Sequence, residues 1–193
     1  SEGEHQLLSK RIHACLKQDY NASINGGEYF IRSLYFDDPF DTALWEKSSG
    51  VGSRDKFRIR IYNMQDNTIK LERKHKEGQY IKNDSPFAMQ FYGIFLANHL
   101  RPKVLVDYTR EPYVFPAEDV RITFDKNIRT AMRNTDLFNP NVITYPVWDL
   151  KNCMILEVKF NESLPQYVQE LLTLGAAERT AASKYVFCRQ YEF

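Results

Sequence analysis

The feature that most constrains the fold is a pair of alternating segments joined by a short polar connection. The segments read KFRIRIY, at Lys56 to Tyr62, and IKLERK, at Ile69 to Lys74. Charged or polar residues alternate with apolar ones over most of both segments, and a period of two indicates β-strands. Because the mostly polar segment Met64 to Asn67 lies between them, we expect the two strands to pair as an antiparallel hairpin.

Alternation places the charged side chains of this hairpin together on one face. That face carries Arg58, Arg60, Lys70, Glu72 and Lys74. Like charges opposite one another destabilise a pair of strands, so the face needs either water or an anionic ligand over it. Two interpretations are open at this point: the solvated outer face of an ordinary sheet, and a binding surface for an anion.

Length and composition describe an ordinary globular domain. The chain has 193 residues, of which 43% are hydrophobic and 26% are charged, and we expect a single domain. Its formal net charge is +1, so no overall field draws it to nucleic acid or to a membrane. Any anion-binding site must therefore arise from a local concentration of charge.

Cysteine usage and hydropathy indicate the cellular location to expect for this chain. Cys15, Cys153 and Cys188 show no metal-binding spacing, and an odd number of cysteines fits a reducing compartment, so we expect a cytoplasmic protein. The longest uncharged stretch, Phe87 to Leu100, is too short to span a bilayer, and no signal peptide is recognisable. We therefore expect no membrane segment in this chain.

The remaining periodic segments indicate several helices and further strands. We expect helices at Glu2 to Lys17, Phe40 to Lys47, Phe87 to Asn98 and Gln166 to Leu174, and strands at Tyr29 to Phe36, Gln79 to Lys82, Lys103 to Arg110, Val120 to Asp125 and Met154 to Phe160. The segment from Arg133 to Pro146 is rich in Asn and Pro and is expected to be a surface loop.

The later strands repeat the polar face of the hairpin. Arg121, Thr123 and Asp125 alternate with apolar residues in one strand, and Glu157 and Lys159 do so in another. An open sheet with one wet side would explain this pattern. Arginine, however, grips phosphate oxygens with two hydrogen bonds, and its concentration beside a few acids favours a phosphate site with a divalent cation.

Seven motifs together carry a resemblance that covers most of the chain in order. They are SLYFD at Ser33, KFRIRIY at Lys56, LERK at Leu71, RPKVLVDYTRE at Arg101, VRITFD at Val120, ILEVKF at Ile155 and SKY at Ser183. The sequence resembles the VTC-type polyphosphate polymerase domain, a member of the triphosphate tunnel metalloenzymes. The resemblance implies an α+β fold in which an antiparallel β-barrel forms a tunnel with helices packed outside.

The resemblance also implies an activity and the residues that perform it. The family transfers the γ-phosphoryl group of ATP or another nucleoside triphosphate onto growing inorganic polyphosphate, with Mn²⁺ or Mg²⁺. By matching motifs, the triphosphate would be held by Arg58, Arg60, Lys70, Arg110 and Arg121, the metal by Glu157, and further substrate contacts made by Lys74, Lys82, Lys159, Lys184 and Tyr35. Tyr35 fits a hydrogen-bonded wall residue equally well.

The chain departs from the family pattern in two places. The family begins with a strand of alternating acids, which we expect residues 1–193 to lack, and its segment between Lys82 and Arg101 is longer. The same site admits two other functions: a metal-dependent triphosphatase with water as acceptor, and a non-catalytic polyphosphate-binding or polyanion-binding module.

Overall fold

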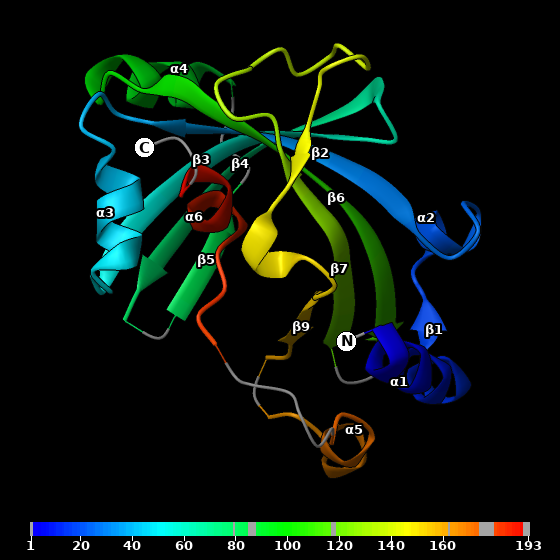
Figure 1. The fold of residues 1–193 in the computed structure, drawn as a ribbon. Coiled ribbons are helices and arrows are strands. Elements are labelled where there is room, and N and C mark those ends of the chain that lie inside the picture. Colours follow the sequence, from blue (N-terminus) through cyan, green and yellow to red (C-terminus); the bar gives the residue numbers. More distant parts are fainter. Residues whose placement is uncertain are drawn as a thin grey trace. The chain divides into compact units, whose positions relative to one another are not determined.

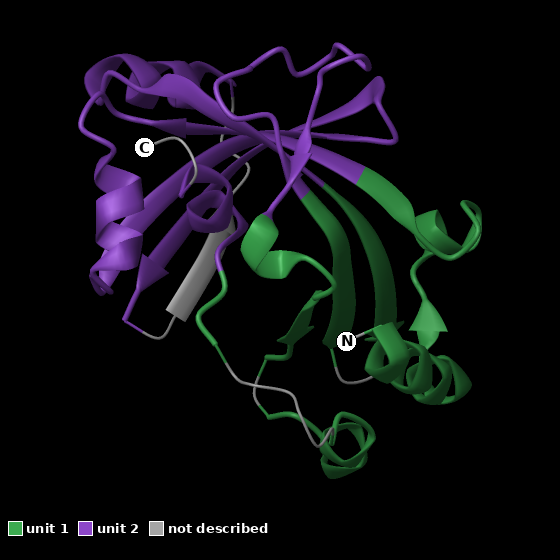
Figure 2. Ribbon diagram, viewed as in Figure 1, with its two compact units in different colours: residues 1–30, 108–128, 148–182 green, residues 31–107, 129–147, 183–193 purple. Residues whose placement is uncertain are grey.

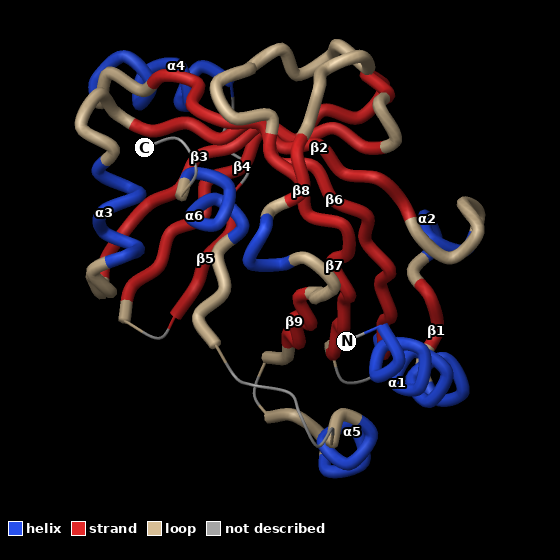
Figure 3. Tube along the Cα trace, in the orientation of Figure 1, coloured by secondary structure: helices blue, strands red, loops and turns tan. Residues whose placement is uncertain are grey.

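The protein is an α+β fold with one large antiparallel sheet and a few helices (Figure 1). A computed structural model describes residues 2–78, 80–84, 88–116, 119–161, 163–173 and 180–190, with residues 80–84 described in their backbone. The described elements, shown by type in Figure 3, are α1 Glu2–Cys15, β1 Lys17–Gln18, α2 Tyr20–Ser23, β2 Tyr29–Asp37, α3 Thr42–Ser48, β3 Ser53–Tyr62, β4 Gln65–Glu77, β5 Tyr80–Asp84, α4 Ala88–Ala97, β6 Arg101–Phe115, β7 Val120–Thr130, β8 Tyr145–Pro146, the 3-10 helix η2 Trp148–Leu150, β9 Ile155–Lys159, α5 Gln166–Leu171 and α6 Lys184–Arg189.

The sheet is open rather than closed into the expected barrel. Its strand order is β5-β4-β3-β2-β6-β7-β8, with β1 pairing with β6 and β9 pairing with β7. Among the described strands no pairing joins β5 to β8, the two ends of this path. The end strand β8 has two residues, and one of them, Pro146, has no N–H to donate to a further strand. That edge therefore offers little backbone for closure.

The chain groups into two compact units, which Figure 2 colours separately. Unit 1 comprises residues 1–30, 108–128 and 148–182, and unit 2 comprises residues 31–107, 129–147 and 183–193. Each unit has its own hydrophobic core and its own polar cluster.

The central hairpin is confirmed and lies in unit 2. Strands β3 and β4 pair antiparallel, and Tyr62 pairs with Gln65, which leaves Asn63 and Met64 as the turn. Both turn residues have positive φ, 50° and 56°, as a two-residue hairpin turn of type I′ requires. The turn therefore precedes the expected one at Met64 to Asn67, because residues 65–67 already belong to β4.

Aromatic packing covers the apolar face of this hairpin. Phe36 of β2 and Phe57 of β3 each meet the ring of Phe91 of α4 edge-on, with ring centroids 5.7 and 5.8 Å apart. Leu34 and Ile61 belong to the same buried cluster. Since strand side chains alternate, covering this face fixes which residues occupy the other one.

The core of unit 1 forms where α1 packs on strands. Leu8 and Ile12 of α1 cluster with Ile122 and Phe124 of β7 and with Val168 of α5. All five side chains are almost completely buried. The expected first helix is therefore held by Leu8 and Ile12, whereas Leu7 of the same helix is 51% exposed.

A buried carboxylate adds polar contacts between α1 and β6. Glu111 accepts hydrogen bonds from the hydroxyls of Ser9 and Tyr113, at 2.5 and 2.6 Å, and from Lys126 at 3.0 Å. Burial alone would raise the pKa of Glu111, but these hydrogen bonds outweigh it and lower the pKa to about 2. Glu111 therefore stays charged at neutral pH and keeps its partners.

Other expected elements differ in extent. The strand expected at Lys103 to Arg110 is β6 and runs from Arg101 to Phe115. The helix expected to reach Leu174 is α5, which ends at Leu171, and Leu174 itself lies outside the described residues. Helix α6 was not among the expected helices. Within the described ranges, no helix is both long enough and apolar enough to cross a bilayer.

The buried pair Arg32–Asp107 of unit 2 generates a stability prediction. Arg32 of β2 donates two hydrogen bonds of 2.8 Å to Asp107 of β6, and each side chain is 3% exposed. Asp107→Ala should lower the free energy of unfolding by about 3–5 kcal/mol, because Arg32 would remain buried without its counter-charge. Urea unfolding measures this loss of free energy.

The control is Glu28→Ala, which removes a 46% exposed partner of Lys126 and should lower the free energy of unfolding by about 0–1 kcal/mol. Equal losses in the two variants would contradict the prediction.

Candidate functional site

The polar face of the β3–β4 hairpin concentrates positive charge. Cross-strand pairing aligns Lys56 with Lys74, Arg58 with Glu72 and Arg60 with Lys70. Residues paired in this way project from the same face of a sheet. These six residues, here named the β3–β4 row, comprise five cationic side chains and one carboxylate. Unit 2 therefore holds a strong excess of positive charge on this face.

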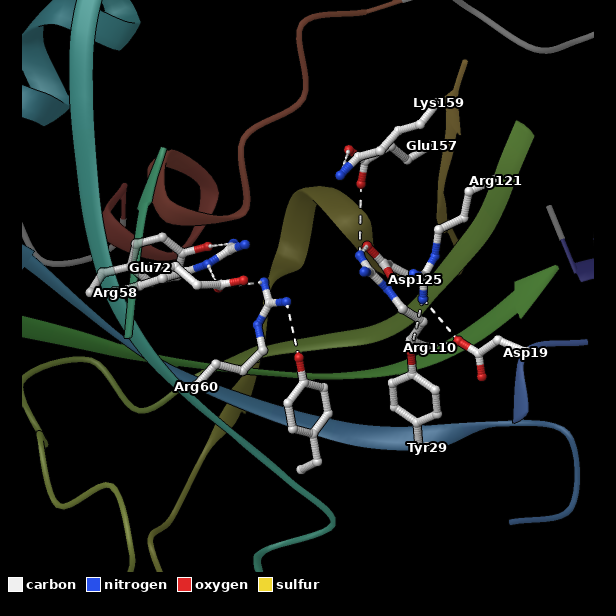
Figure 4. A network of polar contacts seen from close by, with 12 residues as sticks. Asp19, Tyr29, Arg58, Arg60, Glu72, Arg110, Arg121, Asp125, Glu157 and Lys159 are labelled. Atoms are coloured by element: carbon white, nitrogen blue, oxygen red, sulfur yellow. Dashed lines mark hydrogen bonds and ion pairs between the residues drawn. The ribbon is translucent and has the colours of Figure 1, made fainter. Parts of the chain in front are cut away.

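Glu72 lies between the two arginines of the row. Nε of Arg58 donates to Oε2 of Glu72 at 2.6 Å, and the guanidinium of Arg60 lies 3.5 Å from the same oxygen (Figure 4). Burial alone would raise the pKa of Glu72, but the charges of Arg58 and Arg60 lower it. The carboxylate is therefore ionised and neutralises part of the row.

Two tyrosines orient the arginines. The hydroxyl of Tyr35, on β2, accepts from Arg58 at 3.1 Å, and the hydroxyl of Tyr62 accepts from Arg60 at 3.5 Å. Nζ of Lys70 also lies 5.4 Å from the centre of the Tyr62 ring. Tyr35 thus occupies the position of a wall residue that holds a guanidinium.

A buried hydroxyl lies beside Arg60. Ser33 of β2 pairs with Arg60 of β3, so both project from the same face. Ser33 is fully buried, and its hydroxyl has no hydrogen-bond partner among the described residues. Buried hydroxyls normally find a partner, so this one has capacity to bind a ligand.

Lys56 was not among the residues singled out by sequence, and the structure places it at the end of the row. Its Nζ donates to Oγ of Ser183 at 2.8 Å and lies 5.6 Å from the centre of the Tyr185 ring. Burial, followed by the charges of Lys47, Lys74, Arg54 and Arg58, lowers the pKa of Lys56 to about 7. Its position in the alternating run KFRIRIY was the signal that could have identified it.

Helix α6 is anchored directly after Ser183. The hydroxyl of Tyr185 donates to Oδ2 of Asp37 at 2.6 Å, and its ring stacks on Tyr35 with centroids 5.2 Å apart. Burial, reinforced by Asp37, raises the pKa of Tyr185 well above its usual value. Lys184, expected to contact substrate, is the first residue of this helix.

Lys82 occupies a different register position from the row. On β5, Lys82 pairs with His75 of β4, whereas Asn83 pairs with Lys74. Successive strand residues alternate between faces, so the backbone of Lys82 is in register with the face opposite Lys74. Its side chain lies outside the described residues.

A second cluster lies in unit 1, on β6, β7 and β9. Arg110 of β6 donates two hydrogen bonds of 2.7 Å to the carboxylate of Asp125, which is fully buried. The guanidinium of Arg110 also lies 3.7 Å from Glu157, and Lys159 lies 3.7 Å from the other oxygen of Glu157 (Figure 4). Burial would lower the pKa of Arg110, but Tyr108, Asp125 and Glu157 raise it, so its charge is permanent.

Arg121 completes this cluster with partners that the sequence did not indicate. It donates to Asp19 at 2.8 Å and to the hydroxyl of Tyr29 at 3.3 Å. The name β7–β9 cluster is used here for Asp19, Arg110, Arg121, Asp125, Glu157 and Lys159. It contains three cations and three carboxylates, so its charges balance, unlike those of the β3–β4 row.

Glu157 is the most exposed of the three carboxylates in this cluster. Its side chain is 33% exposed, and both of its ion pairs measure 3.7 Å, whereas Asp125 is bound at 2.7 Å. Within the described ranges no group of three or more His, Cys, Asp or Glu side chains could enclose a metal ion. Mg²⁺ is commonly bound by one or two carboxylates together with phosphate oxygens, and Glu157 fits that mode.

One comparison with known proteins shows the family. The chain matches the family model of the VTC domain over residues 4–91 and 78–193. A search of curated proteins finds no match. Fourteen solved chains match; one, described as the structure of PH1819 protein from Pyrococcus horikoshii OT3, has a TM-score of 0.48 and 11% identity, over 93% of this chain and 88% of that chain.

The environment of Glu72 predicts a pH-dependent contribution to stability. Because the folded pKa lies below 4.5, the contribution of Glu72 is complete above that value and is lost as the pH falls through the folded pKa. Glu72→Gln should therefore lower the free energy of unfolding by about 1–3 kcal/mol at pH 7. The difference from wild type should shrink towards pH 3, as followed by urea unfolding.

A matched control uses an exposed acid of the same strand. Asp66→Asn, at the exposed start of β4, should change stability by less than about 0.5 kcal/mol at either pH. A difference between Glu72→Gln and wild type that stays constant from pH 7 to pH 3 would contradict the prediction.

Proposed function

The chain belongs to the VTC domain family, and from that membership we propose that it is a polyphosphate polymerase that transfers the γ-phosphoryl group of ATP onto inorganic polyphosphate. The observation that carries the proposal is the β3–β4 row, in which five basic side chains and one carboxylate lie on one face. So much positive charge on one face favours a ligand with several negative charges. A chain of phosphates meets that requirement.

In this proposal the β3–β4 row holds the phosphates. Arg58 and Arg60 each offer a planar guanidinium that can donate two hydrogen bonds to one phosphate, and Lys70 adds a compact positive charge. The phenol of Tyr35 keeps Arg58 oriented. Lys74 and Lys184 are proposed to make further substrate contacts, whereas the backbone of Lys82 is in register with the other face of the sheet.

The β7–β9 cluster is proposed to contribute further cations and a carboxylate that binds metal. Arg110 is fixed by Asp125 and remains charged, and Arg121 and Lys159 add two more cations. Glu157 would hold Mn²⁺ or Mg²⁺, which supplies positive charge to neutralise phosphate oxygens. Since Glu157 is ion-paired with Arg110 and Lys159, these contacts would rearrange when it binds a cation.

Phosphoryl transfer suits the described side chains. The reaction depends mainly on positioning and on stabilising the charge of the transferred group, and it needs no covalent nucleophile from the protein. The proposal requires no closed tunnel. Cys15, Cys153 and Cys188 are free thiols, which supports a reducing, cytoplasmic location.

Product analysis distinguishes polymerisation from the two other functions open to this site. The full chain is incubated with γ-labelled ATP and Mn²⁺, and the label is followed into acid-insoluble chains and into free phosphate. Acid-insoluble chains are the expected product. Label recovered as free phosphate would indicate a triphosphatase, and label left in ATP, with polyphosphate still bound, would indicate a binding module.

The row also predicts the effect of a single arginine. Arg58→Ala should weaken tripolyphosphate binding by about 1.5–3 kcal/mol, the range for hydrogen bonds to charged groups. Isothermal titration calorimetry measures the change. Arg73→Ala is the control, because Arg73 pairs with Phe57 and so lies on the other face of β4, bound to Asp55. Equal losses in the two variants would mean that binding follows overall charge rather than this face.

A further inference from the structure

The β3–β4 row extends beyond the arginines to a pair of lysines. Lys56, Arg58 and Arg60 follow one another at every second position of β3, so they are spaced by about 6.8 Å along the strand. Opposite them, Glu72 pairs with Arg58, whereas Lys56 faces Lys74. The residue opposite Lys56 on β4 is therefore a second lysine.

The ammonium group of Lys56 is held in a defined place. It donates to Oγ of Ser183, and it lies 5.6 Å from the centre of the Tyr185 ring. Tyr185 is itself fixed by its hydrogen bond to Asp37, and Arg189 of the same helix is bound to Asp41 at 2.9 Å. Lys56 is therefore pre-oriented at the end of the row, as a ligand-binding side chain needs to be.

The charged groups that act on Lys56 are mostly cations. Those with the largest effect on its pKa are Lys47 of α3, Arg54 and Arg58 of β3, and Lys74 of β4. On β2, Asp37 follows Phe36, the partner of Phe57, and it is the carboxylate nearest to Lys56 in this register. The phenol of Tyr185, from α6, is committed to Asp37 and stays neutral. Protonation of Lys56 is consequently opposed by burial and by four neighbouring positive charges. An anion bound beside these groups would offset that opposition by attracting the charged form of Lys56.

We propose that Lys56 is an additional phosphate-binding residue of the β3–β4 row, and that binding of a polyphosphate chain is coupled to uptake of one proton by the Lys56 amine. The proposal rests on the proposed function for the identity of the ligand. The proton comes from solvent and converts the neutral amine into an ammonium ion, which then donates to a phosphate oxygen. No other bond forms or breaks.

Coupling of this kind fixes the direction of the pH dependence. With a pKa of about 7 in the free protein, roughly a tenth of Lys56 is protonated at pH 8. A bound polyanion raises that pKa, so binding at pH 8 takes up close to one proton. Affinity for polyphosphate should therefore fall as the pH rises above about 7, although the ligand itself becomes more negatively charged over that range.

The test is calorimetric titration of the full chain with tripolyphosphate at pH 8, in two buffers with different ionisation enthalpies. The dependence of the observed heat on the buffer gives the number of protons taken up. Wild type is compared with Lys56→Arg, which keeps a positive charge but does not titrate in this range, and with Lys56→Met, which removes the charge. Circular dichroism confirms that both variants are folded.

The expected result separates contact from proton uptake. Lys56→Arg should bind tripolyphosphate with close to one proton fewer than wild type, whereas Lys56→Met should show the same loss of uptake and bind roughly ten- to a hundredfold more weakly at pH 7. Equal proton uptake in wild type and Lys56→Arg, or unchanged affinity in Lys56→Met, would overturn the inference alone. Absence of tripolyphosphate binding by wild type would overturn the proposed function, and this inference with it.

Discussion

Everything on the polar side of unit 2 depends on the aromatic packing on its other side. The basic side chains of the β3–β4 row repel one another, so this face alone does not hold the hairpin together. Its register is maintained because Phe57 and Ile61 are buried against α4, and a slip of one residue would move those side chains into water. The burial of two large side chains, about 1.5–3 kcal/mol each, exceeds the repulsion between partly exposed charges.

The two polar clusters use the same residue types to different effect. In the β7–β9 cluster each cation has a carboxylate within 4 Å, and Arg110 is fixed by the fully buried Asp125. In the β3–β4 row Glu72 is shared by Arg58 and Arg60, and the lysines exceed the available acids. In the β7–β9 cluster, paired charges fix the geometry of the side chains. In the β3–β4 row, the excess of basic side chains favours an anion. A phosphate-binding protein needs both.

Sequence reasoning succeeded where one local period decided the outcome. The alternation in KFRIRIY and LERK predicted the hairpin and the membership of its polar face, both of which are confirmed. It failed where contacts join distant residues: Asp19 is 102 residues from Arg121, and Ser183 is 127 residues from Lys56. Local patterns carry no information on such pairs. The sequence pattern also could not predict whether the sheet closes into a barrel, because closure depends on how the end strands pair.

In the proposed function, Glu72 would limit the affinity of the β3–β4 row for a phosphate ligand. Its carboxylate occupies the hydrogen-bonding groups of Arg58 that a phosphate would use, so an incoming anion must compete with it. Glu72 carries one negative charge, whereas a triphosphate carries several, and electrostatic attraction grows with each added charge. A single phosphate would therefore gain little over the resident carboxylate, while a chain of phosphates also reaches Lys70 and Lys74. Under the proposed function, the acid would thus favour long polyanions over short ones at the same set of cations.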